Sequence, residues 1–131
     1  MGPLGTGQTT KLCNQIVVAS TFVILAEMFG VARAAGVKVD ALPDVLEGGF
    51  ADSTLMRVFG KRMTQRDFAL TSSCKTMLKD LRLIDDLAAA TTAGLPMTAI
   101  AAEMWRMHVA RGYGDEDETT LVKLFDHAEQ P

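Results

Sequence analysis

The sequence predicts an all-α fold, a bundle of about six helices around a long N-terminal central helix. Apolar residues recur at helical spacing, above all between Gln8 and Ala35. Glycines and prolines stand where helices would end or begin, and no segment alternates as a strand does. Aromatic residues make up only 6% of the 131 residues, while Ala, Leu and Met are plentiful, which favours helix over sheet.

The first seven residues are interpreted as a hinge, because three glycines and a proline interrupt them. A helix is then expected from Gln8 to Ala35, with Gly36 as its stop. At 1.5 Å per residue it would be ~40 Å long. Its apolar residues occupy more than one face, which predicts a helix buried on most sides, one that a partner subunit could share. These faces are Leu12, Ile16, Ala19, Val23 and Ala26 on one, and Val17, Ile24 and Val31 on another.

Shorter helices follow, each with a recognisable start or stop. A second is expected over Asp40–Glu47, with Asp40 as cap and Gly48–Gly49 as stop. The third runs from a cap at Asp52 or Ser53 to Gln65, before a turn at Arg66 and Asp67. The fourth spans Ser72–Ala93 and stops at Gly94, and the fifth runs from Pro96 to Arg111 and stops at Gly112 and Gly114. The sixth begins near Asp117 or Thr119 and closes around His127.

Composition excludes several classes of protein. A net charge of -3 argues against a nucleic-acid partner, which usually selects a basic surface. The apolar run from Ile16 to Ala26 contains Ser20 and Thr21 and falls short of the ~20 residues of a membrane span, and no signal segment opens the chain. Cys13 and Cys74 form no metal-binding pattern, so we expect no metal and two buried, reduced thiols of a cytoplasmic protein.

Lys11 is the first candidate for chemistry. Asn14 and Gln15 follow at three and four residues, so all three project from one face of the long helix. The positive end of the helix dipole favours the neutral form of a lysine there, and such a lysine can exchange a proton with a substrate hydroxyl. The alternative is a solvated lysine followed by two amides at a helix start.

Two further segments carry polar residues of interest. Lys79 and Asp80 are either site residues or the polar edge of an amphipathic helix, and Gly48–Thr54 is either a loop that approaches a ligand closely or a helix stop followed by a cap. The remaining candidates are expected to be ordinary: His108 and His127 bind no metal, and the acidic run Asp115–Glu118 is solvated. Trp105 is expected to pack between helices or at a subunit interface. The methionines at 56, 63, 77, 97, 104 and 107 are expected in the core.

The segment Gly2–Gln15 resembles the interdomain signature of the β-hydroxyacid dehydrogenases. This family includes 3-hydroxyisobutyrate dehydrogenase, tartronate semialdehyde reductase, L-threonate dehydrogenase and, more distantly, 6-phosphogluconate dehydrogenase. The resemblance implies that Lys11 is the catalytic proton shuttle and that Asn14 and Gln15 hold the substrate. The Asn-Gln pair is similar to that of the tartronate semialdehyde and threonate branches.

Two other segments extend the resemblance over nearly the whole chain. Met77–Leu81 is similar to the family's Lys-Asp-Leu segment, which implies that Lys79 meets an NAD or NADP cofactor and that Asp80 holds Lys79 or neighbouring polar groups. Gly48–Thr54 resembles a glycine-rich stretch of the tartronate semialdehyde reductases. Thr71–Ser73 departs from the family, which often has phenylalanine there, and this argues for a polar substrate.

The resemblance implies a hinge over residues 1–7 and a helical substrate and dimerisation domain over 8–131. The dinucleotide-binding domain, with its Gly-x-Gly-x-x-Gly loop, is absent from the sequence. We therefore expect part of an NAD(P)-dependent oxidoreductase for a small β-hydroxy acid or its semialdehyde, inactive when isolated and forming a homodimer or higher oligomer. The alternative is a non-catalytic helical module for dimerisation or ligand binding.

Overall fold

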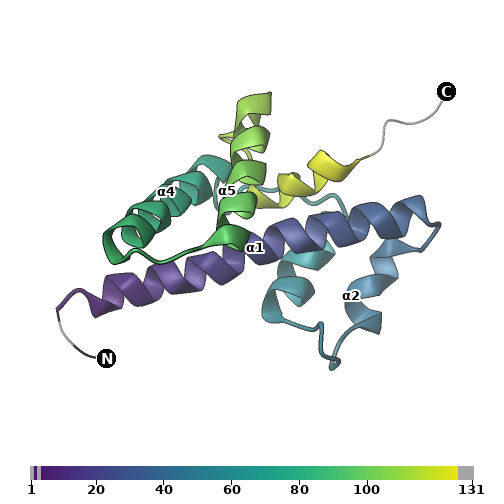
Figure 1. Cartoon of the computed structure of the whole chain (residues 1–131). Helices are drawn as coiled ribbons and strands as arrows, with labels where there is room; N and C mark the ends of the chain where they lie inside the picture. Colours follow the sequence, from purple (N-terminus) through teal and green to yellow (C-terminus); the bar gives the residue numbers. More distant parts are fainter. Residues whose placement is uncertain (1, 3, 127–131) are drawn as a thin grey trace.

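The computed structural model describes residues 2 and 4–126, and α1 (Thr6–Ala34) runs through the whole molecule (Figure 1). The helix begins at Thr6 rather than Gln8, inside the predicted hinge, and Gly36 follows its end with φ 83°. Glycine adopts this left-handed conformation without steric cost, so the predicted stop is confirmed.

The other elements are helical as well, which confirms the all-α prediction. Between residues 4 and 126 the structure has no strand, only an isolated antiparallel bridge between Ser73 and Asp117. The elements after α1 are η1 (Val39–Ala41), α2 (Leu42–Val45), η2 (Met56–Gly60), α3 (Lys61–Thr64), α4 (Cys74–Thr91), α5 (Pro96–His108), η3 (Val109–Tyr113) and η4 (Glu118–Phe125).

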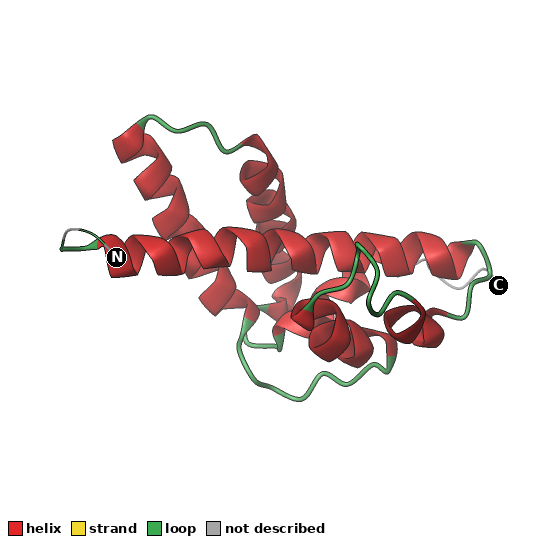
Figure 2. Ribbon diagram, turned by 90° about the horizontal axis from the view of Figure 1, so that it is seen from below, coloured by secondary structure: helices red, strands yellow, loops and turns green. Residues whose placement is uncertain are grey.

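These elements cover α1 from two sides. In Figure 1, α4 and α5 lie above α1 and α2 lies below it; the view from below in Figure 2 shows α1 crossing the full width of the molecule. Trp105 of α5 is fully buried against α1, where its indole Nε1 donates to the carbonyl of Ala19 at 3.1 Å. Its ring meets that of Phe22 edge-on, with centroids 5.8 Å apart. Of the two positions expected for Trp105, the structure shows the one between helices.

The second and third helices differ in detail from the prediction. Asp40 is not a cap, because the residue before η1 is Lys38 and Asp40 lies inside that turn. Pro43 has no backbone N–H and is favoured in a first helical turn, so the predicted helix divides into η1 and α2. Ser53 provides the third cap, since its Oγ accepts the backbone N–H of Met56 at 3.0 Å.

The ends of the later helices also shift. α4 ends with Thr92 at φ 53°, two residues before the expected Gly94, so a threonine takes the left-handed position. α5 ends at His108 and passes into the π-helical turn η3, in which Gly112 has φ 101°. η4 is a 3-10 helix capped by Asp117, one of the two expected starts. His127, its expected end, lies outside the described residues.

Asp117 joins the segment before α4 to the start of η4. Its carboxylate accepts hydrogen bonds from the backbone N–H of Thr71 at 2.7 Å and from that of Thr119 at 2.9 Å, as well as from both threonine hydroxyls. Burial alone would raise the pKa of this carboxyl, but the hydrogen bonds from Thr119 and Thr71 outweigh it and lower the pKa. Arg62 adds an ion pair at 3.4 Å.

The expectation of a solvated acidic run is therefore wrong for its last two residues. Asp117 and Glu118 are both buried, whereas Asp115 and Glu116 are exposed. Burial raises the pKa of Glu118 to about 7, a hydrogen bond with Ser72 opposes this, and the nearby carboxylates of Asp117 and Asp80 add to it. Glu118 is thus a buried carboxyl that takes up a proton near neutral pH.

Sulfur-containing side chains follow the core prediction only in part. Cys74 is buried, and burial raises the pKa of its thiol to about 11, but Cys13 is exposed on α1, against the prediction. Methionines 56, 63 and 77 lie in the core. Met97 and Met107 are exposed on α5, because the core-facing stripe of that helix passes through Thr98, Ala101 and Trp105 instead.

α1 is long and apolar enough to cross a membrane, with a mean hydropathy of 1.9 over its most apolar stretch. The central helix of a protein core satisfies the same test, so length and hydropathy alone decide nothing. In this structure α1 packs against α4, α5 and η4, and its largest side chains, Phe22 and Phe29, are buried among them. These contacts agree with the predicted central position.

Gly30 is expected to be essential for the packing of η4 on α1. A Cβ atom there would lie 2.8 Å from Cβ of Phe125 and 3.2 Å from its carbonyl oxygen, so one element would have to move. Gly30→Ala should lower the free energy of unfolding by about 2 kcal/mol, measured by urea denaturation. Gly7→Ala in the same helix meets nothing within 4 Å and should be neutral or slightly stabilising. Equal stability of the two variants would contradict this account.

Glu118 should make stability fall as pH rises. Its folded-state pKa of about 7 exceeds the ordinary 4.5, so its contribution is fully present below pH 4.5 and is lost as pH rises through 7. Glu118→Gln removes this dependence, and the free energy of unfolding of the variant should exceed that of the wild type by roughly 3 kcal/mol at pH 8 but not at pH 4.5.

His108 also titrates, but it is present in both the wild type and Glu118→Gln, so its effect cancels in the difference between their stabilities. Burial, followed by the charges of Lys123 and Arg111, lowers the pKa of His108 to about 4. The effect of His108 on stability is therefore opposite to that of Glu118, because the protein loses stability as pH falls from 6.5 towards 4. Denaturation curves of both proteins at several pH values give the difference directly. A difference that does not change with pH would refute the assignment.

Candidate functional site

Gln15 and Asp80 connect the two polar segments that the sequence singled out. The side-chain Nε2 of Gln15 on α1 donates to Oδ2 of Asp80 on α4 at 3.0 Å, and Asn14 Nδ2 donates to Gln15 Oε1 at 3.2 Å. Asp80 is only 8% exposed, whereas Asn14 is exposed. A line of hydrogen bonds therefore runs from a buried carboxylate through one amide to a second amide at the surface.

Lys11 lies one helical turn before Asn14 and Gln15, on the same side of α1. Its side chain is exposed. Because α1 begins at Thr6, Lys11 is in the second turn, where the effect of the helix dipole has largely decayed. The predicted grouping of Lys11, Asn14 and Gln15 on one surface follows from this helix, but the dipole contributes less to Lys11 than expected.

Lys79 and Asp80 point in different directions. Adjacent residues of a helix are about 100° apart, so Asp80 faces α1 while Lys79 is exposed. The partner of Asp80 is Gln15, and among the described residues no ion pair joins Asp80 to Lys79. Of the two partners that the resemblance offered for Asp80, the structure shows the neighbouring polar group.

The glycine-rich segment 48–54 is not brought to Lys11 within this chain. It lies below α1 in Figure 1, whereas α4 lies above. Gly48, at φ 80°, ends the preceding helical turn, and its N–H donates to Asp52 Oδ2 at 2.8 Å. Phe50 is fully exposed at this loop. The segment thus has the geometry of a helix stop followed by a cap.

The polar segment 71–73 has a structural use. Thr71 and Ser72 donate their backbone N–H groups to Asp117, and the Thr71 hydroxyl does the same.

Glu118 lies near this segment and within electrostatic range of Asp80. Sequence reasoning missed it, because nothing in an acidic run distinguishes a buried member. Asp117 was expected as a helix start, since aspartate is a typical N-cap, but its hydrogen bonds with the segment before α4 were not expected.

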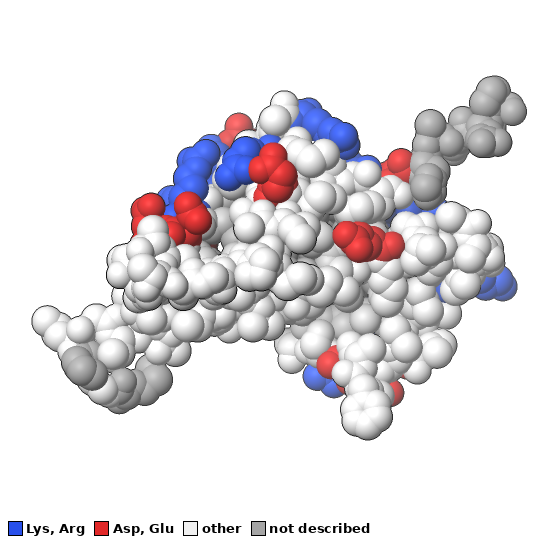
Figure 3. All heavy atoms as spheres, in the orientation of Figure 1, with Lys and Arg blue, Asp and Glu red and all other residues white. Residues whose placement is uncertain are grey.

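The site offers amide, amine and carboxylate groups. Over the described part of the chain, no three His, Cys, Asp or Glu side chains are grouped so that they could hold a metal ion. Charged side chains gather instead over α4 and α5, while the face of α1 visible in Figure 3 is almost free of them. Hydrogen bonding to a small polar molecule and proton exchange are the chemistry that these groups can perform.

Comparisons with known proteins give this geometry a context. The family described as "NAD-binding of NADP-dependent 3-hydroxyisobutyrate dehydrogenase" matches residues 5–125. The 2-hydroxy-3-oxopropionate reductase of Escherichia coli K12 is 34% identical over 126 residues, which are 96% of this chain and 43% of that protein. The chain thus spans less than half the length of this relative.

Two solved structures have the same fold as this chain. The crystal structure of 3-hydroxyisobutyrate dehydrogenase from Salmonella typhimurium superposes with a TM-score of 0.87 at 28% identity, over 92% of this chain and 42% of that one. The 3-hydroxyisobutyrate dehydrogenase of Mycobacterium tuberculosis, solved with L-serine, gives 0.82 at 27% identity, over 92% and 44%. The chain therefore belongs to the family of NAD-binding domains of NADP-dependent 3-hydroxyisobutyrate dehydrogenase.

Proposed function

We propose that this chain is the helical part of an NAD(P)-dependent oxidoreductase that acts on a small β-hydroxy acid or its semialdehyde. The observation that carries the proposal is the Gln15–Asp80 hydrogen bond, which joins the two family-like segments at one place beside Lys11. Family membership supports the reaction class, and the L-serine in the mycobacterial structure is itself a small hydroxy acid.

In this proposal Lys11 moves a proton at the substrate hydroxyl. When an alcohol is oxidised to a carbonyl, its carbon loses a hydride and its oxygen loses a proton, and an amine within reach can take that proton. Asn14 presents the exposed end of the hydrogen-bonded line and orients the substrate. Gln15 uses its amide N–H on Asp80 and its carbonyl on Asn14, so it orients the substrate chiefly by holding Asn14 in place.

A nicotinamide cofactor supplies or accepts the hydride when it is bound. Lys79 is the group of this chain that fits it, since an exposed ammonium next to Asp80 can bind a phosphate or carbonyl oxygen of such a molecule. The glycine loop that would cradle its phosphates is not in this sequence, so the isolated chain is expected to be inactive. The predicted cytoplasmic location stays a prediction.

Replacement of Lys11 tests the proposed proton transfer. A chimaera in which this chain replaces the matching part of the E. coli reductase would be assayed with tartronate semialdehyde, L-threonate and 3-hydroxyisobutyrate. Lys11→Ala should lower kcat by about 10²–10⁴-fold with a small change in KM, because the substrate keeps its amide contacts. Lys38→Ala, at an exposed lysine after α1, serves as the matched control. Unchanged kcat in Lys11→Ala would contradict the assigned role.

A second candidate function is self-association through α1. Val17, Ile24 and Val31 recur every seven residues on the side of α1 opposite the core and are 62%, 57% and 67% exposed. An apolar stripe of this kind on a long helix is typical of a surface covered by another chain. A hollow of about 850 Å³ lined by Ile24, Val31 and Phe125 extends the same surface towards η4. We propose that a second copy of this chain covers the stripe, because apolar residues that recur every seven positions allow two copies of a helix to pack side by side.

Sedimentation of the chain at several concentrations tests this candidate. The wild type should form a dimer, and Ile24→Lys should shift it to monomer, because a lysine at the centre of the stripe would be buried without a partner. Val45→Lys, at another exposed valine on α2, should leave the dimer intact. A monomeric wild type, or a dimer that tolerates Ile24→Lys, would exclude self-association through this face.

A further inference from the structure

A hollow lies between α4 and α5, on a different side of α4 from the Gln15–Asp80 pair. Its volume is about 550 Å³, which is within the range of small-molecule sites. Leu81, Arg82 and Asp85 of α4 line it, whereas Asp80 points to α1. Because the two sets of side chains leave α4 in different directions, the hollow is separate from the candidate dehydrogenase site.

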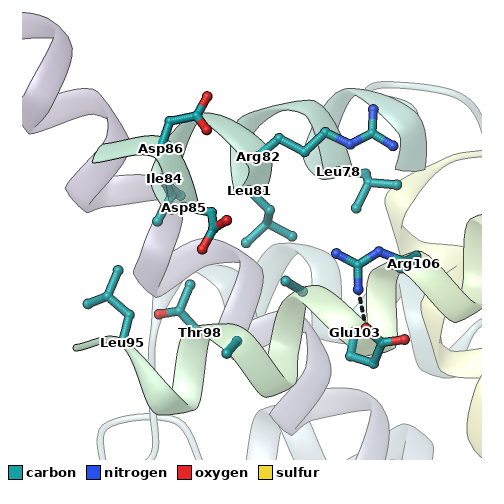
Figure 4. A pocket seen from close by; sticks show the side chains of 12 residues that line it. Leu78, Leu81, Arg82, Ile84, Asp85, Asp86, Leu95, Thr98, Glu103 and Arg106 are labelled. Carbon is teal, nitrogen blue, oxygen red and sulfur yellow. Dashed lines mark hydrogen bonds and ion pairs between the residues drawn. The ribbon is translucent and has the colours of Figure 1, made fainter. Parts of the chain in front are cut away.

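The floor of the hollow is apolar and its rim is charged. Leucine, isoleucine and alanine side chains of the two helices form the floor: Leu78, Leu81, Ile84, Leu95, Ala99 and Ala102. Figure 4 shows Asp85 of α4 and Thr98 of α5 at one end of the hollow, and the guanidinium groups of Arg82 and Arg106 at the other. An elongated molecule with an apolar middle fits this arrangement.

The rim charges are largely uncompensated by the protein. Arg106 forms an ion pair with Glu103, but Arg82, Asp85 and Asp86 form none with any residue in the described part of the chain. Asp85 lies at one end and the two guanidinium groups lie at the other, where Glu103 already pairs with Arg106 and Arg82 has no ion-pair partner among the described residues. A ligand with an ammonium at one end and a carboxylate at the other would complement both.

Thr98 places a hydroxyl group at the hollow. Its side chain is only 7% exposed and lines the hollow, yet its hydroxyl forms no hydrogen bond with any described residue. The hydroxyl oxygen itself is not shut off from solvent, so a ligand in the hollow can reach it and form a hydrogen bond with it. Thr98 lies at the same end of the hollow as Asp85, so an ammonium bound there could donate to both.

We propose that the hollow between α4 and α5 binds a small aliphatic ω-amino carboxylate. Its ammonium lies between Asp85 and Thr98, its methylene chain lies over Leu81 and the alanines of α5, and its carboxylate meets Arg82 and Arg106. This assignment does not depend on the dehydrogenase proposal, because none of these residues takes part in it.

Titration of the chain with 4-aminobutanoate, 5-aminopentanoate and 6-aminohexanoate, followed by NMR chemical shifts of the backbone amides, tests the assignment. We expect saturable shifts on α4 and α5 with a dissociation constant of about 1 mM for the best-fitting length. Hexanoate and pentylamine, which each lack one charge, should bind about tenfold more weakly. Asp85→Asn and Thr98→Val should weaken binding by similar factors, while Asp40→Asn, at an exposed acid on η1, should not.

Three results would overturn the proposal. The first is the absence of saturation up to about 50 mM of every probe. The second is equal binding by the wild type and a folded Asp85→Asn variant, and the third is a set of shifts centred on Lys11 and Gln15 instead of α4 and α5. Melting curves of Asp85→Asn and Thr98→Val, both close in shape to the native residues, show whether each variant is folded.

Discussion

The Asp117 carboxylate fixes where α4 begins, and the position of the candidate site follows from it. Asp117 accepts hydrogen bonds from Thr71 and Thr119, and its backbone pairs with Ser73 just before α4. Once its first turn is held, a helix has no further freedom of rotation, so the direction of Asp80 is determined as well. A slip of one residue would turn Asp80 by about 100° away from Gln15. A buried acid in an irregular segment thus sets the geometry of a site on two regular helices.

α1 has three different surfaces, and the rest of the chain covers two of them while the third is exposed. Its core side packs Phe22 and Phe29 against α5, η4 and the segment around Gly60. Its first turns carry Asn14 and Gln15 towards α4, and its outer side carries the stripe centred on Ile24. Periodicity along a sequence shows that several faces are apolar but does not say which face the chain itself covers.

Regular features of the fold were predictable because they depend on local sequence. Gly36 ends α1 as a glycine after a helix does, and the apolar pattern of α1 requires a central helix. Thr92 instead of Gly94 at the end of α4 was not predictable, since a threonine at φ 53° is tolerated only where the surroundings hold it. The burial of Glu118 and the exposure of Cys13 likewise depend on neighbours distant in sequence. For the site, helical spacing placed Lys11 beside the amides, but the Gln15–Asp80 contact needs the relation of two helices.

The side chains of the candidate site differ in how firmly the chain holds them. Asp80 is buried and hydrogen-bonded, so the amides of Gln15 and Asn14 are held before any ligand arrives. Lys11 and Lys79, by contrast, are surrounded by water. Proton exchange by an amine becomes effective when water is excluded and the substrate hydroxyl is held within reach, and both conditions require a surface that closes over the lysines. In the proposed reaction the helices of this chain would supply orientation, and water would be excluded by whatever covers the start of α1.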